Sequence, residues 1–179
     1  SILGALFAPS LFINSAVAAV LEGNARVDAI IRANAAINSL GRIEGDFVQT
    51  NPNRTSNGGK FWLNRPGKMR FEYGAPSPLL LVSDGSDVVI VDKRLRTTER
   101  YPLRSTPLYF LLKPNVNLGQ DVLVSSVEAV NGKLILICRD RQNQANGELR
   151  IVFSANMKLE EWSIKDRQNR VTQVRISNI

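Results

Sequence analysis

Histidine is absent from this sequence of 179 residues. The absence removes the side chain that most often serves as a general base or metal ligand, and with it every catalytic triad built on imidazole. Cys138 is the only cysteine, so the chain forms no intramolecular disulfide, CxxC redox pair or cysteine-based metal cluster. Its neighbours Leu136 and Ile137 are apolar, which favours a buried structural thiol over a reactive one.

Carboxylates offer no obvious replacement for the missing imidazole. Glu160 and Glu161 are adjacent on an expected strand, so their side chains point to opposite faces and cannot share one cleft. We therefore predict that the protein is not an enzyme, and we expect no metal site.

Acidic residues are outnumbered, with 16 Asp and Glu against 23 Lys and Arg, which gives a net charge of +7. Such a surplus attracts lipid headgroups, nucleic acid or acidic proteins. The cations are scattered and no nucleic-acid-binding motif accompanies them, so we expect no nucleic-acid partner. The hydrophobic fraction of 44% and the length are those of one globular domain.

Charge is also missing from the first 21 residues. An apolar run over 2–12 precedes the small residues of 15–19, as in a secretory signal peptide with an A-x-A cleavage site. A proline and an asparagine interrupt the segment, which argues against a membrane-spanning helix. We predict a signal-peptide remnant over 1–19, cleavage of the full precursor near Ala18, and a single domain over 20–179.

Helical periodicity is confined to one long segment. Apolar side chains recur at helical spacing between a candidate cap, Asn24, and a stop at Gly41, which predicts an amphipathic helix over 24–40. The apolar positions are Val27, Ile30, Ile31, Ile37 and Leu40.

The remainder of the chain reads mostly as short strands between Asn, Asp, Pro and Gly turns, the pattern of an antiparallel meander. The eleven expected strands are 43–50, 58–65, 68–74, 78–83, 87–93, 95–101, 121–130, 133–139, 147–154, 158–165 and 170–177. One break, at 102–120, holds an apolar segment that predicts a short helix over 106–113, with Pro107 in its first turn and Pro114 beyond its end. A plain core helix is the alternative interpretation.

Period-two alternation is clearest at Met69, Phe71 and Tyr73, which leave one face of their strand apolar. A sheet of about eleven strands has to curl or close, and two helices offer much less apolar surface than such a sheet. The concave face is then incompletely filled, and a nonpolar ligand would bind there. A fully packed core gives the same alternation, so both alternatives stay open at this point.

Several segments together resemble the LolA-type periplasmic lipoprotein carriers. Asp46 to Gln49 is similar to the F-x-Q motif of their first strand, and Gly59 to Tyr73, reading GKFWLNRPGKMRFEY, to their strand, Arg-Pro turn and aromatic strand. Pro76 follows at the place of the family's proline. Leu80 to Gly85, reading LLVSDG, is similar to the family's next strand and its Asp-Gly turn, and Thr106 to Leu112 is similar to the lid helix. The resemblance covers roughly residues 24 to 179.

The resemblance implies a mainly β fold, an unclosed (half) antiparallel β-barrel of about eleven strands. An N-terminal helix and a short lid helix would cover its concave apolar face. It also implies a monomeric periplasmic chaperone without a cofactor. Such a carrier takes acylated outer-membrane lipoproteins from an inner-membrane lipoprotein-releasing ABC transporter to an outer-membrane lipoprotein receptor. A periplasmic domain of the same fold that senses lipids or lipoproteins is the alternative.

The alternation of apolar residues and the resemblance to the LolA-type carriers together predict the site residues. The expected cavity-lining residues are Phe47, Phe61, Leu63, Met69, Phe71, Tyr73 and Leu81. The expected lid residues are Arg65, Leu108, Tyr109, Phe110, Leu111 and Leu112. Arg65 is in phase with Phe61 and Leu63 and matches the family's lid-closing arginine, whose donors would bind carbonyl oxygens at the end of the lid helix. Without the resemblance, these side chains read as ordinary core and Arg65 as an exposed arginine at a strand end.

Overall fold

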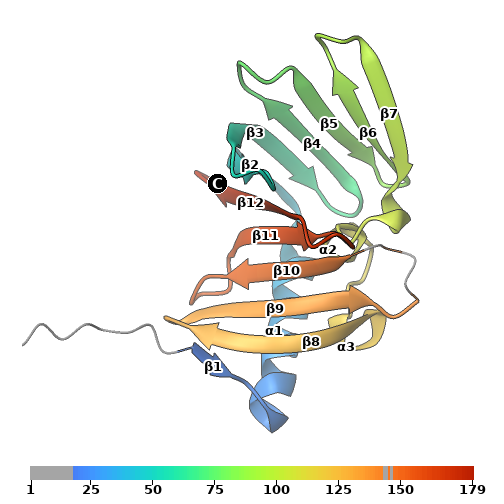
Figure 1. Cartoon of the computed structure of the whole chain (residues 1–179). Coiled ribbons are helices and arrows are strands. Elements are labelled where there is room, and N and C mark those ends of the chain that lie inside the picture. The colour runs from blue at the N-terminus through green and yellow to red at the C-terminus, as the bar shows by residue number, and fades with distance from the viewer. Residues whose placement is uncertain (1–17, 143–144, 146) are drawn as a thin grey trace, which may run out of the picture.

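One antiparallel sheet dominates the computed structural model, which describes residues 18–142, 145 and 147–179 (Figure 1). Its twelve described strands follow the order β1-β8-β9-β10-β11-β12-β2-β3-β4-β5-β6-β7. Their bounds are β1 Ala18–Val20, β2 Arg42–Thr50, β3 Ser56–Asn64, β4 Lys68–Tyr73, β5 Leu79–Asp84, β6 Asp87–Asp92, β7 Thr97–Pro102, β8 Val122–Val130, β9 Lys133–Asp140, β10 Glu148–Phe153, β11 Leu159–Lys165 and β12 Val171–Ser177. Because β1 and β7 end this order, the described sheet is not closed, and the predicted open antiparallel β fold is confirmed.

The twelfth strand, β1, is the one that sequence patterns miss. It pairs with β8, with Ala19 opposite Ala129. Ala18 and Ala19 fall in the expected signal-peptide remnant 1–19, of which residues 1–17 lie outside the described part of the chain. Three small apolar residues carry no alternation, and their pairing with a strand about a hundred residues away leaves no local trace. The other eleven strands lie within two residues of their predicted bounds.

Helix α1 (Gly23–Ser39) matches the predicted helix within one residue at each end, but only part of the predicted apolar face, with Ile30, Ile37 and Leu40, packs against the core. Ala29, Ala33 and Ile37 are buried, whereas Val27 and Ile31 are 56% and 60% exposed. Small side chains let the helix approach the sheet closely, which the apolar pattern does not reveal. α1 crosses behind β8–β11 in Figure 1.

The ends of α1 also differ from the prediction. Glu22 is the N-cap residue and makes no side-chain capping bond, so Asn24 is not the cap. At the other end the Leu40 N–H donates to the Ile37 carbonyl, one residue before Gly41. Two asparagines of α1 hold residues 116–118 in place. The Asn38 amide donates to the Val116 carbonyl and accepts the Val116 N–H, both at 2.8 Å, and the Asn34 Oδ1 accepts the Leu118 N–H at 2.9 Å.

The break at 102–120 contains three short helices instead of the one predicted over 106–113. They are η1 (Leu103–Ser105, a 3-10 turn), α2 (Tyr109–Leu112) and α3 (Leu118–Asp121). Pro107 lies in the turn before α2, where its carbonyl accepts the Phe110 N–H at 3.1 Å, and not in the first helical turn. None of the helices in the described ranges is long and apolar enough to cross a membrane.

A glycine in mid-strand brings the aromatic rings of the concave face together. Gly59 on β3 lies opposite Phe47 on β2 and Tyr73 on β4, and the two rings meet across it at a centroid distance of 4.9 Å. A Cβ atom at Gly59 would lie 1.9 Å from the Glu72 carbonyl oxygen. Because that obstacle is backbone of the neighbouring strand, no side-chain rotation could relieve it.

Gly59→Ala is therefore expected to lower the free energy of unfolding by about 2 kcal/mol or more, through strain in the β3–β4 pairing. Denaturant unfolding followed by circular dichroism would measure the loss. The control is Gly41→Ala, because a Cβ atom there meets nothing within 4 Å. Equal stability of the two variants would contradict this account of Gly59.

Candidate functional site: an apolar cavity under a lid

An apolar cavity lies between the sheet and the segment that we call the lid, residues 106–113. Its volume is about 20 Å³, which is room for about one water molecule. Every lining side chain is apolar: Leu40, Ile43, Phe61, Leu63, Met69, Phe71, Leu108, Leu111, Leu112, Leu159, Trp162 and Ile176. Three leucines of the lid, Leu108, Leu111 and Leu112, line the cavity opposite the sheet.

Seven of the predicted site residues line this cavity. They are Phe61, Leu63, Met69, Phe71, Leu108, Leu111 and Leu112. The register explains the grouping on the sheet side, since Phe61 pairs with Phe71 and Leu63 with Met69 across β3 and β4.

Three predicted cavity residues lie beside the cavity. The Phe47 ring packs edge-on against Phe71 at a centroid distance of 4.8 Å, and Leu81 pairs with Phe71 from β5. The Tyr73 hydroxyl donates to the Gln49 Oε1 at 2.5 Å, and burial raises the pKa of Tyr73 to about 12. These side chains thus lie next to the residues that line the cavity and do not line it themselves.

Five lining residues were not predicted: Leu40, Ile43, Leu159, Trp162 and Ile176. Ile43 lies four residues before Phe47 on β2 and therefore on the same face of the strand, so the period-two pattern could have placed it on the concave face. Trp162 and Ile176 depend on how β11 and β12 align with the N-terminal strands. The Trp162 ring lies 6.0 Å from the Phe71 ring, although the two residues are far apart in sequence.

Arg65, at the end of β3, joins three parts of the molecule through one guanidinium group. Nε donates to the Leu111 carbonyl at 2.8 Å and Nη2 to the Lys113 carbonyl at 2.6 Å, both at the end of the lid. Nη1 donates to the Ile37 carbonyl of α1 at 2.8 Å. Burial lowers the pKa of Arg65, but an arginine stays charged in proteins, so these bonds are charge-assisted. The three carbonyls lie at helix ends, where intrahelical partners run out, and the Ile37 carbonyl also accepts the Leu40 N–H.

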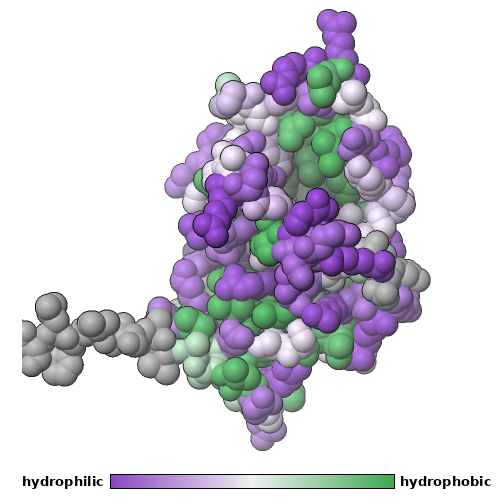
Figure 2. Space-filling view, in the orientation of Figure 1, coloured by the Kyte–Doolittle hydropathy of each residue, from purple (hydrophilic) through white to green (hydrophobic). Residues whose placement is uncertain are grey.

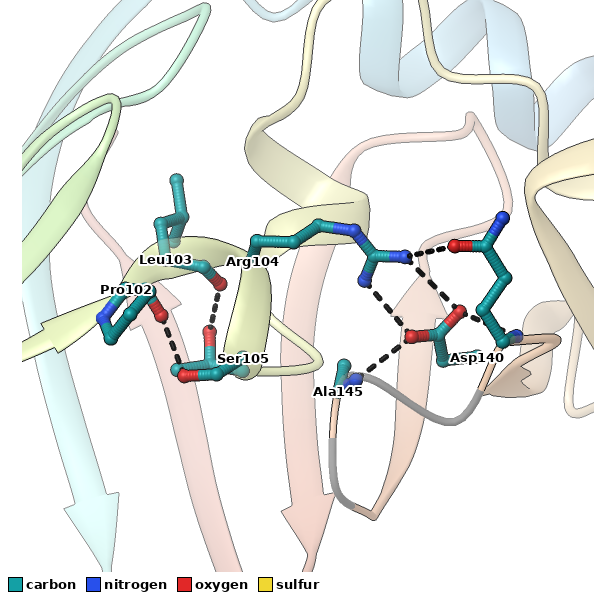
Figure 3. A network of polar contacts seen from close by, with 8 residues as sticks. Pro102, Leu103, Arg104, Ser105, Asp140 and Ala145 are labelled. Atoms are coloured by element: carbon teal, nitrogen blue, oxygen red, sulfur yellow. Dashed lines mark hydrogen bonds and ion pairs between the residues drawn. The ribbon is translucent and has the colours of Figure 1, made fainter.

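A second arginine anchors the beginning of the lid (Figure 3). Arg104, in η1, pairs with Asp140 at 2.9 Å, and its guanidinium lies 4.9 Å from the centre of the Tyr109 ring and 5.5 Å from that of Phe110. The Asp140 side chain is 1% exposed and also accepts the Ala145 N–H at 2.8 Å. The two predicted lid aromatics, Tyr109 and Phe110, thus pack on this arginine rather than lining the cavity.

The pKa of Asp140 results from opposing effects. Burial raises it, whereas hydrogen bonds from Arg104 and from the backbone N–H groups of Ala145 and Gln142 lower it to about 2. The carboxylate is therefore ionised at every pH near neutral, and the anchor does not respond to pH there.

Residues 38–179 match the family model of the outer membrane lipoprotein carrier protein LolA. The chain belongs to the LolA family. A curated outer-membrane lipoprotein carrier protein from Chromobacterium violaceum is 34% identical over 89 residues, which are 48% of this chain and 43% of the relative. This match spans less than half of the length of the relative.

Two crystal structures have a similar chain course. A LolA superfamily protein from Nitrosomonas europaea is 9% identical, with 85% of this chain and 91% of that chain covered and a TM-score of 0.43. An uncharacterized conserved protein from Thermus thermophilus is 8% identical, with coverage of 84% and 83% and a TM-score of 0.45. Both scores are below 0.5, so the family assignment depends on the match over 38–179.

Arg65→Leu is expected to loosen the closed lid of this LolA-family chain. Bonds from a charged donor contribute about 1.5–3 kcal/mol each, and solvent reaches part of this site, so we expect roughly tenfold faster amide exchange over the lid. Hydrogen exchange with mass spectrometry at residues 108–113 would measure it. Arg70→Leu is the control, because its pair with Glu72 is exposed on β4. A large loss of melting temperature with unchanged exchange in the lid would make Arg65 a purely structural residue.

Asp140→Asn is expected to remove an acid-sensitive part of the stability. A pKa depressed from the ordinary value of 3.8 to about 2 stabilises the fold above that range, and the stabilisation disappears as pH falls from about 4 towards 2. The difference in melting temperature between wild type and variant should be constant near neutral pH and shrink over that interval. A difference that grows with acidity would contradict the assignment.

Proposed function

We propose that this LolA-family protein is a periplasmic carrier that shields the acyl chains of outer-membrane lipoproteins. In this proposal it receives them from an inner-membrane ABC transporter, delivers them to an outer-membrane receptor, and acts as a monomer without cofactor or catalysis. The observation that supports it best is a wholly apolar cavity of about 20 Å³ beneath a lid held by hydrogen bonds.

The energy of the cargo sets what a carrier has to provide. At about 0.8 kcal/mol per methylene, exposing an acyl chain of about 14 methylenes to water costs roughly 11 kcal/mol. A carrier must offer comparable burial and still release its cargo. A closed cavity with room for one water molecule cannot accept such a chain, so the lid has to move before loading.

The lid leucines occupy the space that the cargo would take. Leu111 and Leu112 are 4% and 2% exposed in the closed state, so lifting the lid exposes apolar surface on both of its sides. An incoming acyl chain would cover the sheet side again, and the exchange of one apolar cover for another is nearly balanced. In this proposal the barrier includes the bonds that hold the end of the lid, from Arg65 and from the Gly67 N–H to the Leu112 carbonyl at 2.7 Å, while Arg104 keeps its beginning attached.

Binding of the purified protein to a diacylated or triacylated lipoprotein tests the proposal. We expect a one-to-one complex and very weak binding of the same polypeptide without acyl chains, because apolar burial would supply the affinity. Leu63→Glu should weaken binding by tenfold or more, since a charge in the cavity wall meets the hydrocarbon directly. Calorimetry would measure each affinity.

Val48→Glu is the matched control, because Val48 is 50% exposed on β2 and does not line the cavity. Leu63 is chosen over Phe71 because it is only partly buried, so a charge there disturbs folding less. Equal affinity for acylated and unacylated cargo would exclude the carrier mechanism. Binding of lipoprotein without transfer to acceptor membranes would favour the sensing domain.

A further inference from the structure

The hairpin that joins β6 to β7 ends in the four residues Lys93, Arg94, Leu95 and Arg96, which we call the basic tip. Leu95 is 66% exposed, the highest exposed fraction of any large apolar side chain in the described residues. Three cations therefore surround an apolar side chain that projects into water. The tip lies far from the cavity wall along the sheet, because β5 separates this hairpin from β4.

The conformation of the basic tip is fixed by hydrogen bonds. The Asp92 Oδ1 accepts the backbone N–H groups of Arg94 and Leu95, both at 2.9 Å. The Lys93 N–H donates to the Pro78 carbonyl at 3.0 Å, and Arg96 has a left-handed φ of 55°. The tip thus presents Leu95 and its cations in one defined arrangement.

The positive charge of the tip is not neutralised within the described part of the chain. No ion pair joins Lys93, Arg94 or Arg96 to a described residue, and the carboxylate of Asp92 is engaged by backbone. Two carboxylates on nearby strands are paired with other arginines, Asp87 with Arg100 at 2.9 Å and Glu72 with Arg70 at 2.6 Å, whereas Glu99 of β7 accepts a hydrogen bond from the Tyr101 hydroxyl at 2.8 Å and keeps its charge. The tip thus carries three positive charges, which the neighbouring Asp92 carboxylate offsets only in part.

Apolar side chains continue from the tip along the outer face of the arm that strands β5, β6 and β7 form. Leu80 pairs with Val91 and Val82 with Val89, on the face opposite Leu81, and these four do not pack against the core. Strands apolar on both faces are typical of sheets covered on both sides, yet the described residues cover only the concave side here. Figure 2 shows apolar side chains gathered over β4–β6 and hydrophilic ones beyond them at the end of the β6–β7 hairpin.

We propose that the basic tip docks on the anionic surface of a phospholipid membrane. Lys93, Arg94 and Arg96 bind headgroup phosphates, and Leu95 enters the boundary between headgroups and acyl chains. Cations near such a surface and an apolar anchor among them reinforce each other, which is the usual composition of a reversible membrane contact. The proposal concerns a surface outside the cavity and does not depend on the cargo.

Co-sedimentation with lipid vesicles tests this docking. Vesicles of equal parts phosphatidylethanolamine and phosphatidylglycerol should bind the full chain, vesicles of phosphatidylcholine should not, and salt should weaken binding by screening. Replacing the three cations together (Lys93→Gln, Arg94→Gln, Arg96→Gln) should weaken binding by about tenfold to a hundredfold. Leu95→Ser should weaken it by severalfold.

The matched control removes three other exposed cations, with Arg42→Gln, Lys68→Gln and Lys158→Gln. These three have no ion-pair partner in the described ranges. They lie near the β3–β4 and β10–β11 turns, at the edge of the sheet opposite the one from which the basic tip projects. The control variant has the same net charge as the tip variant and should keep most of the binding. Equal losses in both variants would reduce the effect to net charge and overturn the proposal.

The depth of Leu95 can be measured directly. A dye on Leu95→Cys should shift its emission to shorter wavelength on the anionic vesicles, whereas a dye on Lys158→Cys should not. The native Cys138 does not interfere, because it is buried and burial raises the pKa of its thiol to about 12. Absence of the shift would overturn insertion. Failure of wild type to bind the anionic vesicles, with impaired cargo delivery in the tip variant, would overturn membrane docking and favour an acidic protein partner.

Discussion

The concave face of the sheet must be kept from water, and within the described residues α1 and the short helices after β7 supply its cover. The strands turn Phe47, Phe61, Phe71, Ile151 and Phe153 towards this face, all of them buried. α1 covers one half of the face by lying close on small alanines. The other half is covered by the lid, which is too short to be held by its own helical hydrogen bonds.

Closure of the lid therefore depends on bonds made from outside it. Arg65 links the end of β3, the end of α1 and the end of the lid, while Arg104 and Asp140 hold the beginning of the lid to the strand β9. The two contacts differ in character. Arg65 binds neutral carbonyls in a partly exposed place, whereas Asp140 is a nearly inaccessible carboxylate. Such a difference suits an end that releases and a beginning that stays attached.

The two faces of the arm formed by β5–β7 differ in what they pack against. Leu81 and Ile90 pack towards the core, while Leu80, Val82, Val89 and Val91 lie on the opposite face. One side of the arm thus packs towards the core beside the cavity, and the other side faces away from it. The proposed cargo binding and the proposed membrane docking therefore need not compete for the same side chains.

Local patterns in the sequence determined the strands, the turns between them and the position of Arg65 at the end of an apolar strand face, because alternation and turn chemistry are encoded by neighbouring residues. The family resemblance added the lid. Tertiary structure decided the rest: the alanine face of α1, the pairing of β1 with β8, and the meeting of Trp162 with Phe71. The third partner of Arg65, the Ile37 carbonyl, is also a tertiary result. Each of these depends on how closely two distant elements approach and in what register, and that is set by packing of the whole sheet and not by any segment of it.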